Sequence, residues 1–152
     1  MTSQRDHQEE RGGLRPMERP RVFVCSPYRE YVQRGRVFTV EENVGRAQRL
    51  CLELQNRGWA PFAPHLFLPQ LRDEAREEER AIGLACGMAF LSVSALVVVD
   101  DRSKMSAGMA LEVARAQLLR VPILYLFSEP LPLAVTAASA WRALHSAGGL
   151  RG

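Results

Sequence analysis

The sequence predicts a small doubly wound α/β domain, Rossmann-like or flavodoxin-like, whose parallel sheet of four to five strands is flanked by helices. Short β-branched and apolar runs alternate along the chain with longer segments of helical periodicity. This alternation is typical of parallel strands joined by right-handed crossovers. The length of 152 residues, with 47% hydrophobic and 24% charged, suits one globular domain with a core of ordinary size.

The elements follow from periodicity and from local signals. Strands are expected over 21–25, 59–63, 95–99 and 121–127, and helices over 40–57, 72–91, 106–119 and 131–143. A long polar connection over 27–40 and a proline-bracketed loop over 64–69 are expected between them. Connections as long as the first one are usually functional or mobile. The order of the strands cannot be read from the sequence.

Several residues mark where these elements begin and end. Thr39 and Glu42 have the spacing of a capping box, and Gly58 suits the end of the same helix. Ser106 is placed to cap the third helix. Pro61 weakens the second strand or puts it near a sheet edge, because proline has no N–H to donate.

The domain organisation is simple. Residues 1–20 are polar and mixed in charge and predict a flexible tail, 21–147 predict a single domain, and 148–152 a loose C-terminus. The start of the chain lacks the pattern of a secretory signal, and no apolar run approaches about 18 residues. We therefore expect a cytoplasmic protein without a membrane-spanning helix.

Charge and cysteine content limit the possible partners. A net charge of +3 is too small to indicate a dedicated nucleic-acid binder. Cys25, Cys51 and Cys86 lack metal-like spacing and stand in apolar surroundings. We expect all three to be buried free thiols in a reducing compartment.

The candidate site lies at the end of the third strand. An apolar run stops there at Asp100 and Asp101, and a helix begins after Ser106 with the small residues that precede Glu112. Open α/β sheets bind ligands at such strand ends, and a helix N-terminus offers N–H groups to an anion such as phosphate. A carboxylate in that position can attack the anomeric carbon of a sugar. The alternative is a solvated helix glutamate that pairs with Arg115 or Arg120.

Two segments resemble the nucleoside 2-deoxyribosyltransferase-like superfamily, which includes deoxyribosyltransferases and nucleotide N-glycosidases. They are Val-Phe-Val-Cys-Ser-Pro-Tyr-Arg over 22–29 and Ser-x-Gly-x-x-x-Glu over 106–112. Shorter segments at 43–47, 63–66, 79–84 and 106–109 are similar to an uncharacterised bacterial and phage branch of that superfamily. The resemblance extends over 21–125, and the order of the segments makes it more specific than any one of them.

The resemblance implies roles for individual residues. Glu112 would be the nucleophile on C1 of the sugar, and the start of its helix would hold the sugar 5′ end or its phosphate. The implied substrate is a nucleoside or nucleoside 5′-monophosphate, with no metal and no cofactor, and relatives of this kind assemble as homodimers or larger homo-oligomers. The substrate-binding residues that it implies are Ser26, Tyr28, Arg29, Ser106, Gly108 and Met109.

The chain departs from the superfamily pattern at one position that matters. Catalysing members carry an aspartate in the helix before the third strand, where this chain has Met88 between Gly87 and Ala89. Asp100 or Asp101 at the strand end can supply a carboxylate instead. The alternative is that they only solvate the strand end and form the turn that follows it. The departure raises the question of whether the domain turns its ligand over.

Other candidate residues have both functional and structural interpretations. His65 can contact the base or protonate its leaving nitrogen, or can be held by loop carbonyls. Tyr28 can stack on a base or pack in its loop, and Arg29 can bind phosphate or be solvated. Asn43 is placed to tie the long loop to the first helix.

Together these features predict an N-glycosidase or deoxyribosyltransferase that cleaves the base–sugar bond through a covalent ribosyl-enzyme intermediate. Glu112, Asp100 and His65 are its expected catalytic residues. The alternative is a nucleotide-binding or sensing module of the same fold, which the missing helix aspartate favours.

Overall fold

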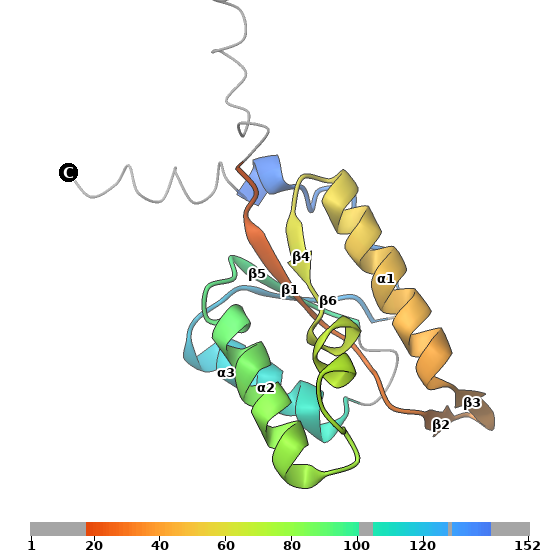
Figure 1. Ribbon diagram of the computed structural model, residues 1–152. Helices are drawn as coiled ribbons and strands as arrows, with labels where there is room; N and C mark the ends of the chain where they lie inside the picture. The colour runs from red at the N-terminus through yellow and green to blue at the C-terminus, as the bar shows by residue number, and fades with distance from the viewer. Residues whose placement is uncertain (1–17, 101–104, 128, 141–152) are drawn as a thin grey trace, which may run out of the picture.

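Four parallel strands form the sheet at the centre of the protein (Figure 1). They are β1 (Arg21–Cys25), β4 (Ala60–Phe62), β5 (Leu96–Val99) and β6 (Ile123–Tyr125), in the spatial order β4-β1-β5-β6. The computed structural model describes residues 18–100, 105–127 and 129–140. The predicted α/β class and parallel sheet are confirmed, and the strand order is the flavodoxin-like one among doubly wound sheets.

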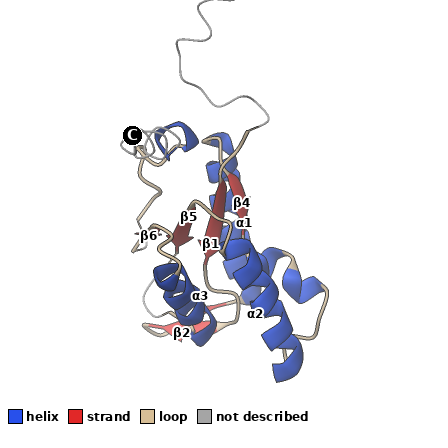
Figure 2. Ribbon diagram, turned by 90° about the vertical axis from the view of Figure 1, so that its left-hand side faces the viewer, coloured by secondary structure: helices blue, strands red, loops and turns tan. Residues whose placement is uncertain are grey.

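Helices cover both faces of the sheet. They are α1 (Val40–Asn56), α2 (Glu77–Leu91) and α3 (Ala107–Leu118). The side chains of β1 alternate between the faces: Val22 and Val24 pack with Leu50 and Leu54 of α1, and Phe23 and Cys25 pack with Leu91 of α2 and Val113 of α3. Figures 1 and 2 show α1 on one side of the sheet and α2 with α3 on the other. The fold is therefore doubly wound, as the sequence predicts.

The long connection after β1 contains a hairpin that the sequence analysis missed. Strands β2 (Tyr31–Gln33) and β3 (Arg36–Phe38) pair antiparallel, and Tyr31 stacks on Phe38 with ring centroids 4.7 Å apart. The two turn residues, Arg34 and Gly35, have φ values of 49° and 74°, as a type I′ turn requires. The sequence does contain a signal for this hairpin. A two-residue turn that ends in glycine stands between two three-residue segments that each contain a valine and an aromatic residue.

Helix α1 begins and ends where its local signals predict. Thr39 and Glu42 form the complete capping box, and the lowered pKa of Glu42 results first from its bond to the Thr39 backbone N–H. Gly58, at φ 89°, turns the chain out of the helix toward β4. Between these ends, Leu50 and Leu54 lie on the side of α1 that is buried against the sheet.

We expect Thr39→Ala to lower the free energy of unfolding by about 1 kcal/mol, because the Glu42 N–H loses the hydroxyl that it donates to. Urea unfolding at pH 7 measures the change. Thr39→Ser keeps the hydroxyl and is the matched control. Equal destabilisation by both variants would contradict a capping role.

Other boundaries differ from the predicted ones. The loop over 64–69 contains two short 3-10 helices, η2 (Pro64–Leu66) and η3 (Leu68–Gln70). Helix α2 begins at Glu77 rather than at residue 72, because Asp73 closes a turn by accepting from the Ala75 N–H. Strands β4 and β6 are shorter than the predicted 59–63 and 121–127.

The two described ends of the chain lie at the N-terminal end of the sheet (Figure 1). The Ala60 N–H donates to Pro20 O, and the Ala137 N–H donates to Arg57 O. The predicted last helix over 131–143 is described as helical only over 137–140. Residues 1–17 of the predicted tail and the predicted C-terminus at 148–152 lie outside the described residues.

The three cysteines are free, but they are not all buried as expected. Cys25 is buried and Cys51 is partly buried, whereas Cys86 is exposed on α2. The prediction was wrong at Cys86 because residues on every side of α2 are apolar, so apolar neighbours in sequence do not indicate burial there.

Candidate functional site

The strand order places the topological switch point of the sheet at the carboxyl ends of β1 and β5. These neighbouring strands are followed by connections to opposite faces of the sheet, to α1 after β1 and to α3 after β5. Cys25 pairs with Val99 in register, and the Asp100 N–H donates to Cys25 O over 2.8 Å. In doubly wound sheets such a switch point is where ligands bind.

Glu112 lies on the α3 side of this switch point. It is only partly exposed, and burial raises the pKa of its carboxyl to about 7, an effect that a hydrogen bond with Cys25 partly opposes. The Cys25 thiol also lies 3.8 Å from Met109 O. Glu112 is therefore not a fully solvated helix glutamate, and at neutral pH its carboxyl exists in both protonation states.

At the start of α3, the described residues leave space beside Gly108. The Ser106 hydroxyl accepts from the Met109 N–H over 3.2 Å, which confirms the predicted cap. Among the described residues, a Cβ on Gly108 would meet nothing closer than Ser106 Oγ at 4.0 Å. Met109 differs from its neighbours, because its side chain is buried in the core against β1 and β5. Of these residues, Ser106 and Gly108 have the exposure that a ligand contact requires.

A second group of predicted site residues gathers after β1 and β4. Ser26 Oγ lies 3.2 Å from His65 Nε2, and both residues are buried. The Tyr28 ring lies 5.8 Å from the His65 ring. Burial lowers the pKa of His65 to about 4, so the ring is neutral at pH 7. A neutral ring suits hydrogen bonding to a base better than the proton donation that its ordinary pKa suggests.

Asp100 lies on the α1 side and has a partner that the sequence analysis did not assign. Arg46 of α1 binds it in a fork, with Nη2 to Oδ1 at 2.8 Å and Nε to Oδ2 at 3.4 Å. Asp100 is 4% exposed, so this guanidinium balances a buried charge. A groove of about 360 Å³ opens beside the pair, between α1 and the segment after β6. Asp101 lies outside the described residues.

Tyr31 of the hairpin is a further residue that the sequence analysis missed. Its hydroxyl is buried and has no hydrogen-bond partner among the described residues. Burial raises its pKa, and the charges of Arg46 and Asp100 also act on it. The hairpin therefore brings a phenol close to the ion pair, which no sequence motif could indicate.

The loop that carries Tyr28 and Arg29 is held by its neighbours. The Asn43 side-chain amide donates to the carbonyls of Tyr28 and Arg29 at 3.2 and 3.0 Å, which confirms the predicted tie to α1. The Arg29 guanidinium donates to Glu74 O at 2.5 Å, in the segment before α2. This contact orients Arg29 toward the start of α2.

The position of the missing aspartate is filled by apolar packing. Met88 packs against the cluster that contains Phe23 and Cys25. A Cβ on the neighbouring Gly87 would lie 3.4 Å from Pro64 Cβ, so this glycine allows α2 to approach η2 closely. Within the described ranges, no three His, Cys, Asp or Glu side chains are placed to hold a metal ion.

We expect Arg46→Met to lower the free energy of unfolding by about 2 kcal/mol, because it removes the guanidinium that binds the buried Asp100 carboxylate. The value is reduced for the partial exposure of the arginine. Urea unfolding at pH 7 measures it, and Arg49→Met, one turn away on the same helix, is the control. Equal effects of the two variants would contradict the importance of the pair.

A family model described as "Domain of unknown function (DUF7768)" matches residues 20–126. The chain belongs to this family. The matched residues of this DUF7768 domain extend from the start of β1 to the end of β6 and include every predicted site residue. No curated protein matches the chain in sequence.

A solved structure with a similar fold is the 2-deoxyribosyltransferase from the psychrotolerant bacterium Bacillus psychrosaccharolyticus. The TM-score is 0.52, with 14% sequence identity over 82% of this chain and 89% of that chain. The resemblance seen in the sequence is thus confirmed at the level of the fold. That protein is described as a biocatalyst for the synthesis of nucleosides. No helix in the described parts of the present chain has the length and apolar character to span a membrane.

Proposed function

We propose that this domain cleaves or exchanges the base–sugar bond of a nucleoside or nucleoside 5′-monophosphate, with Glu112 as the nucleophile. The observation that carries the proposal is a partly buried carboxyl at the switch point, next to a helix N-terminus where none of the described residues crowds Gly108. The fold shared with a 2-deoxyribosyltransferase supports the same substrate class.

The chemistry needs Glu112 in its ionised form. Its carboxylate attacks C1 of the sugar, and the base leaves with the electron pair of the C–N bond and takes up a proton. The ester between sugar and enzyme is then resolved at C1 by water in hydrolysis, or by a second base in transfer. A carboxylate with a raised pKa is the stronger nucleophile once ionised, so the rate should increase as the pH rises through about 7.

The surrounding residues supply binding. The helix N-terminus at Ser106 and Gly108 suits a 5′-phosphate, because its backbone N–H groups and dipole favour an anion. Ser26, Tyr28 and His65 form a polar, partly aromatic group that suits a base. Asp100, held by Arg46, is the candidate acid in place of the missing helix aspartate.

The test is to incubate the protein with a panel of deoxynucleosides, nucleosides and their 5′-monophosphates and to measure free base by chromatography. We expect base release that disappears in Glu112→Gln and persists in Glu77→Gln, a control at an exposed glutamate of α2. Trapping the sugar on Glu112 with a 2-fluoro substrate analogue, followed by mass spectrometry, tests the covalent step separately.

The second candidate function is nucleotide binding without turnover. Met88, where catalysing members carry an aspartate, favours it. Tight binding of a monophosphate by calorimetry, with no base release over the whole panel, would reject the catalytic proposal and support this one. In either case we expect a cytoplasmic homo-oligomer that acts on small molecules, with no specific nucleic-acid or membrane partner.

A further inference from the structure

Cys25 lies where β1, β5 and the start of α3 meet. It is the last residue of β1, and its backbone O accepts from the Asp100 N–H over 2.8 Å. Its side chain is completely buried on the face that α3 covers, where it packs with Met109 and Val113. Because side chains alternate along a strand, Cys25 is the last side chain of β1 on this face before the chain leaves the sheet.

The Cys25 thiol has two acceptors on the same turn of α3. It lies 3.8 Å from Met109 O, and the Cys25 side chain also forms a hydrogen bond with the Glu112 carboxyl. Met109 and Glu112 are three residues apart in the helix, so the two acceptors are neighbours. A thiol has one proton and can donate it to only one of them at a time.

The protonation state of Glu112 determines which acceptor the thiol uses. A carboxylate is a stronger acceptor than a backbone carbonyl, so the thiol donates to Glu112 when that side chain is ionised. When the carboxyl is protonated, the thiol can donate to Met109 O instead, and its buried S–H keeps a partner. The hydrogen bond to Glu112 therefore favours the ionised form, which is the form that can attack a sugar.

Titratable groups at the ends of the neighbouring strands have other partners. Asp100, which follows β5, is bound by Arg46 on the α1 side. Tyr125 of β6 stacks on Phe127, with ring centroids 5.8 Å apart. Among these groups of the described chain, Cys25 is the one that bonds to the proposed nucleophile.

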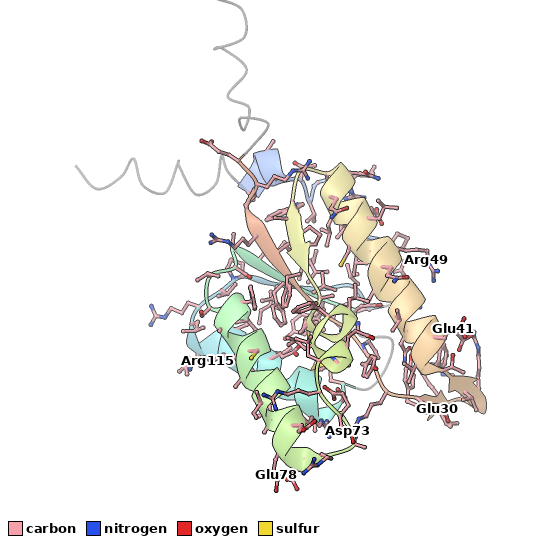
Figure 3. All side chains as sticks on the ribbon, viewed as in Figure 1. Glu30, Glu41, Arg49, Asp73, Glu78 and Arg115 are labelled. Carbon is pink, nitrogen blue, oxygen red and sulfur yellow. The ribbon has the colours of Figure 1, made fainter. Side chains whose placement is uncertain are left out.

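The charges on the covering helices lie mainly at their ends and outer sides. Those within α2 are confined to residues 77–80 in its first turn, and Figure 3 shows Glu78 at the outer tip of this helix. Arg115 of α3 is exposed (Figure 3). Within the described part of the chain, burial and the Cys25 hydrogen bond are the two causes of the Glu112 pKa.

We propose that Cys25 is a positioning residue for the nucleophile: its thiol donates to one oxygen of the ionised Glu112 carboxyl and leaves the other oxygen free to attack C1. This role rests on the proposed function of Glu112. No bond to sulfur forms or breaks in the reaction. Because a thiol is a weak donor, burial still outweighs the hydrogen bond, and Glu112 titrates near neutral pH.

The first test measures the pKa of Glu112 without any substrate, by carbon-13 NMR of its side-chain carboxyl. The signal is assigned by its loss in Glu112→Gln. Cys25→Ser should lower the pKa, because a hydroxyl is a stronger donor than a thiol, and Cys25→Ala should raise it, because the donor is lost. We expect each shift to be at least about half a pH unit. Cys25→Val also lacks a donor but fills the space, so it should raise the pKa without leaving a cavity.

The other buried-side cysteine provides matched controls. Cys51 is partly buried and packs against the core on the α1 side of the sheet. Cys51→Ser and Cys51→Ala should therefore leave the Glu112 pKa unchanged. The proposal is overturned if Cys25→Ser and Cys25→Val leave that pKa unchanged or shift it in the same direction, since opposite shifts require a donor at position 25.

The second test follows base release by the same variants as a function of pH. The midpoint of the rate should move with the NMR pKa, to lower pH in Cys25→Ser and to higher pH in Cys25→Val. At about pH 9, where Glu112 is largely ionised, Cys25→Ser should keep the wild-type rate within about twofold and Cys25→Val should lose at least about fivefold, because its carboxylate is no longer oriented. A packing role alone would lower the rate without moving the midpoint, and that result would overturn the proposal.

The two tests distinguish failure of this role from failure of the proposed function. Absence of base release in the wild type and in every variant would reject Glu112 as a nucleophile, and with it the use of Cys25 in catalysis. Opposite NMR shifts would still establish the contact between the two side chains in that case. Base release with a midpoint that ignores the Cys25 variants would retain the proposed function and reject the role of Cys25.

Discussion

Glu112→Gln is expected to abolish base release, by at least about a thousandfold, and at the same time to make the protein more stable. The loss of rate follows from the loss of the attacking oxygen. The gain in stability follows from burial, which raises the pKa of Glu112 from 4.5 to about 7. A neutral glutamine of the same shape avoids burying a charge.

The sign of the stability effect depends on pH. Because the folded protein holds the Glu112 proton more tightly than the unfolded chain does, stability is lost as the pH rises from about 4.5 through 7. Above pH 7 the variant should be more stable than the wild type by about 3 kcal/mol, and below pH 4.5 the difference should vanish. Urea unfolding at pH 8 and pH 4 measures it, and Glu77→Gln should change little at either pH.

The two measurements together separate function from structure. A surface glutamate without a role would show neither effect. Loss of activity without a gain in stability at pH 8 would mean that Glu112 has an ordinary pKa in the folded protein, so that burial does not disfavour its ionised form. Stabilisation with unchanged base release would reject Glu112 as the nucleophile and retain only its burial.

The second large effect is expected at His65. Its folded pKa of about 4 lies below the ordinary 6.5, because burial disfavours the charged ring. The unfolded chain therefore binds a proton that the folded protein does not. The resulting loss of stability grows as the pH falls from 6.5 toward 4 and reaches about 3 kcal/mol. As the pH falls from 6.5 to 4.5, the stability lost through His65 is similar in size and opposite in sign to the stability gained through Glu112.

Variants should reveal the two opposing contributions. Relative to the wild type, His65→Asn should gain stability as the pH falls from 6.5 to 4, and Glu112→Gln should gain it as the pH rises from 4.5 to 7. Because each is a difference from the wild type at the same pH, other carboxyl groups cancel. Chemical unfolding at half-unit steps of pH gives both curves. Two flat difference curves would contradict the burial of these side chains.

Local signals were enough to predict much of the fold. The β1 strand, the capping box at Thr39, the cap at Ser106 and the turn at Gly58 each depend on residues close together in the chain, and all are confirmed. The hairpin at Arg34 and Gly35 also carried a local signal, which the sequence analysis did not use. The strand order has no such local signal, because it depends on contacts between segments that are far apart in the chain.

The candidate site was predictable only in part, for the same physical reason. Position along the chain placed Glu112 and Asp100 at the right strand end. The pairing of Asp100 with Arg46 joins residues 54 positions apart. The neutral state of His65 and the raised pKa of Glu112 come from burial, which is set by the whole packed domain. Residue type and spacing along the chain therefore could not predict the pKa shift of His65 or that of Glu112.

Pro61 in the outer strand β4 has a consequence for the behaviour of the protein at high concentration. An edge strand with free N–H and C=O groups invites another chain to add a strand, which is a common route to aggregation. Proline has no N–H to offer, and β4 pairs only over Ala60–Phe62 with β1. The β4 edge therefore resists growth of the sheet from one molecule into the next.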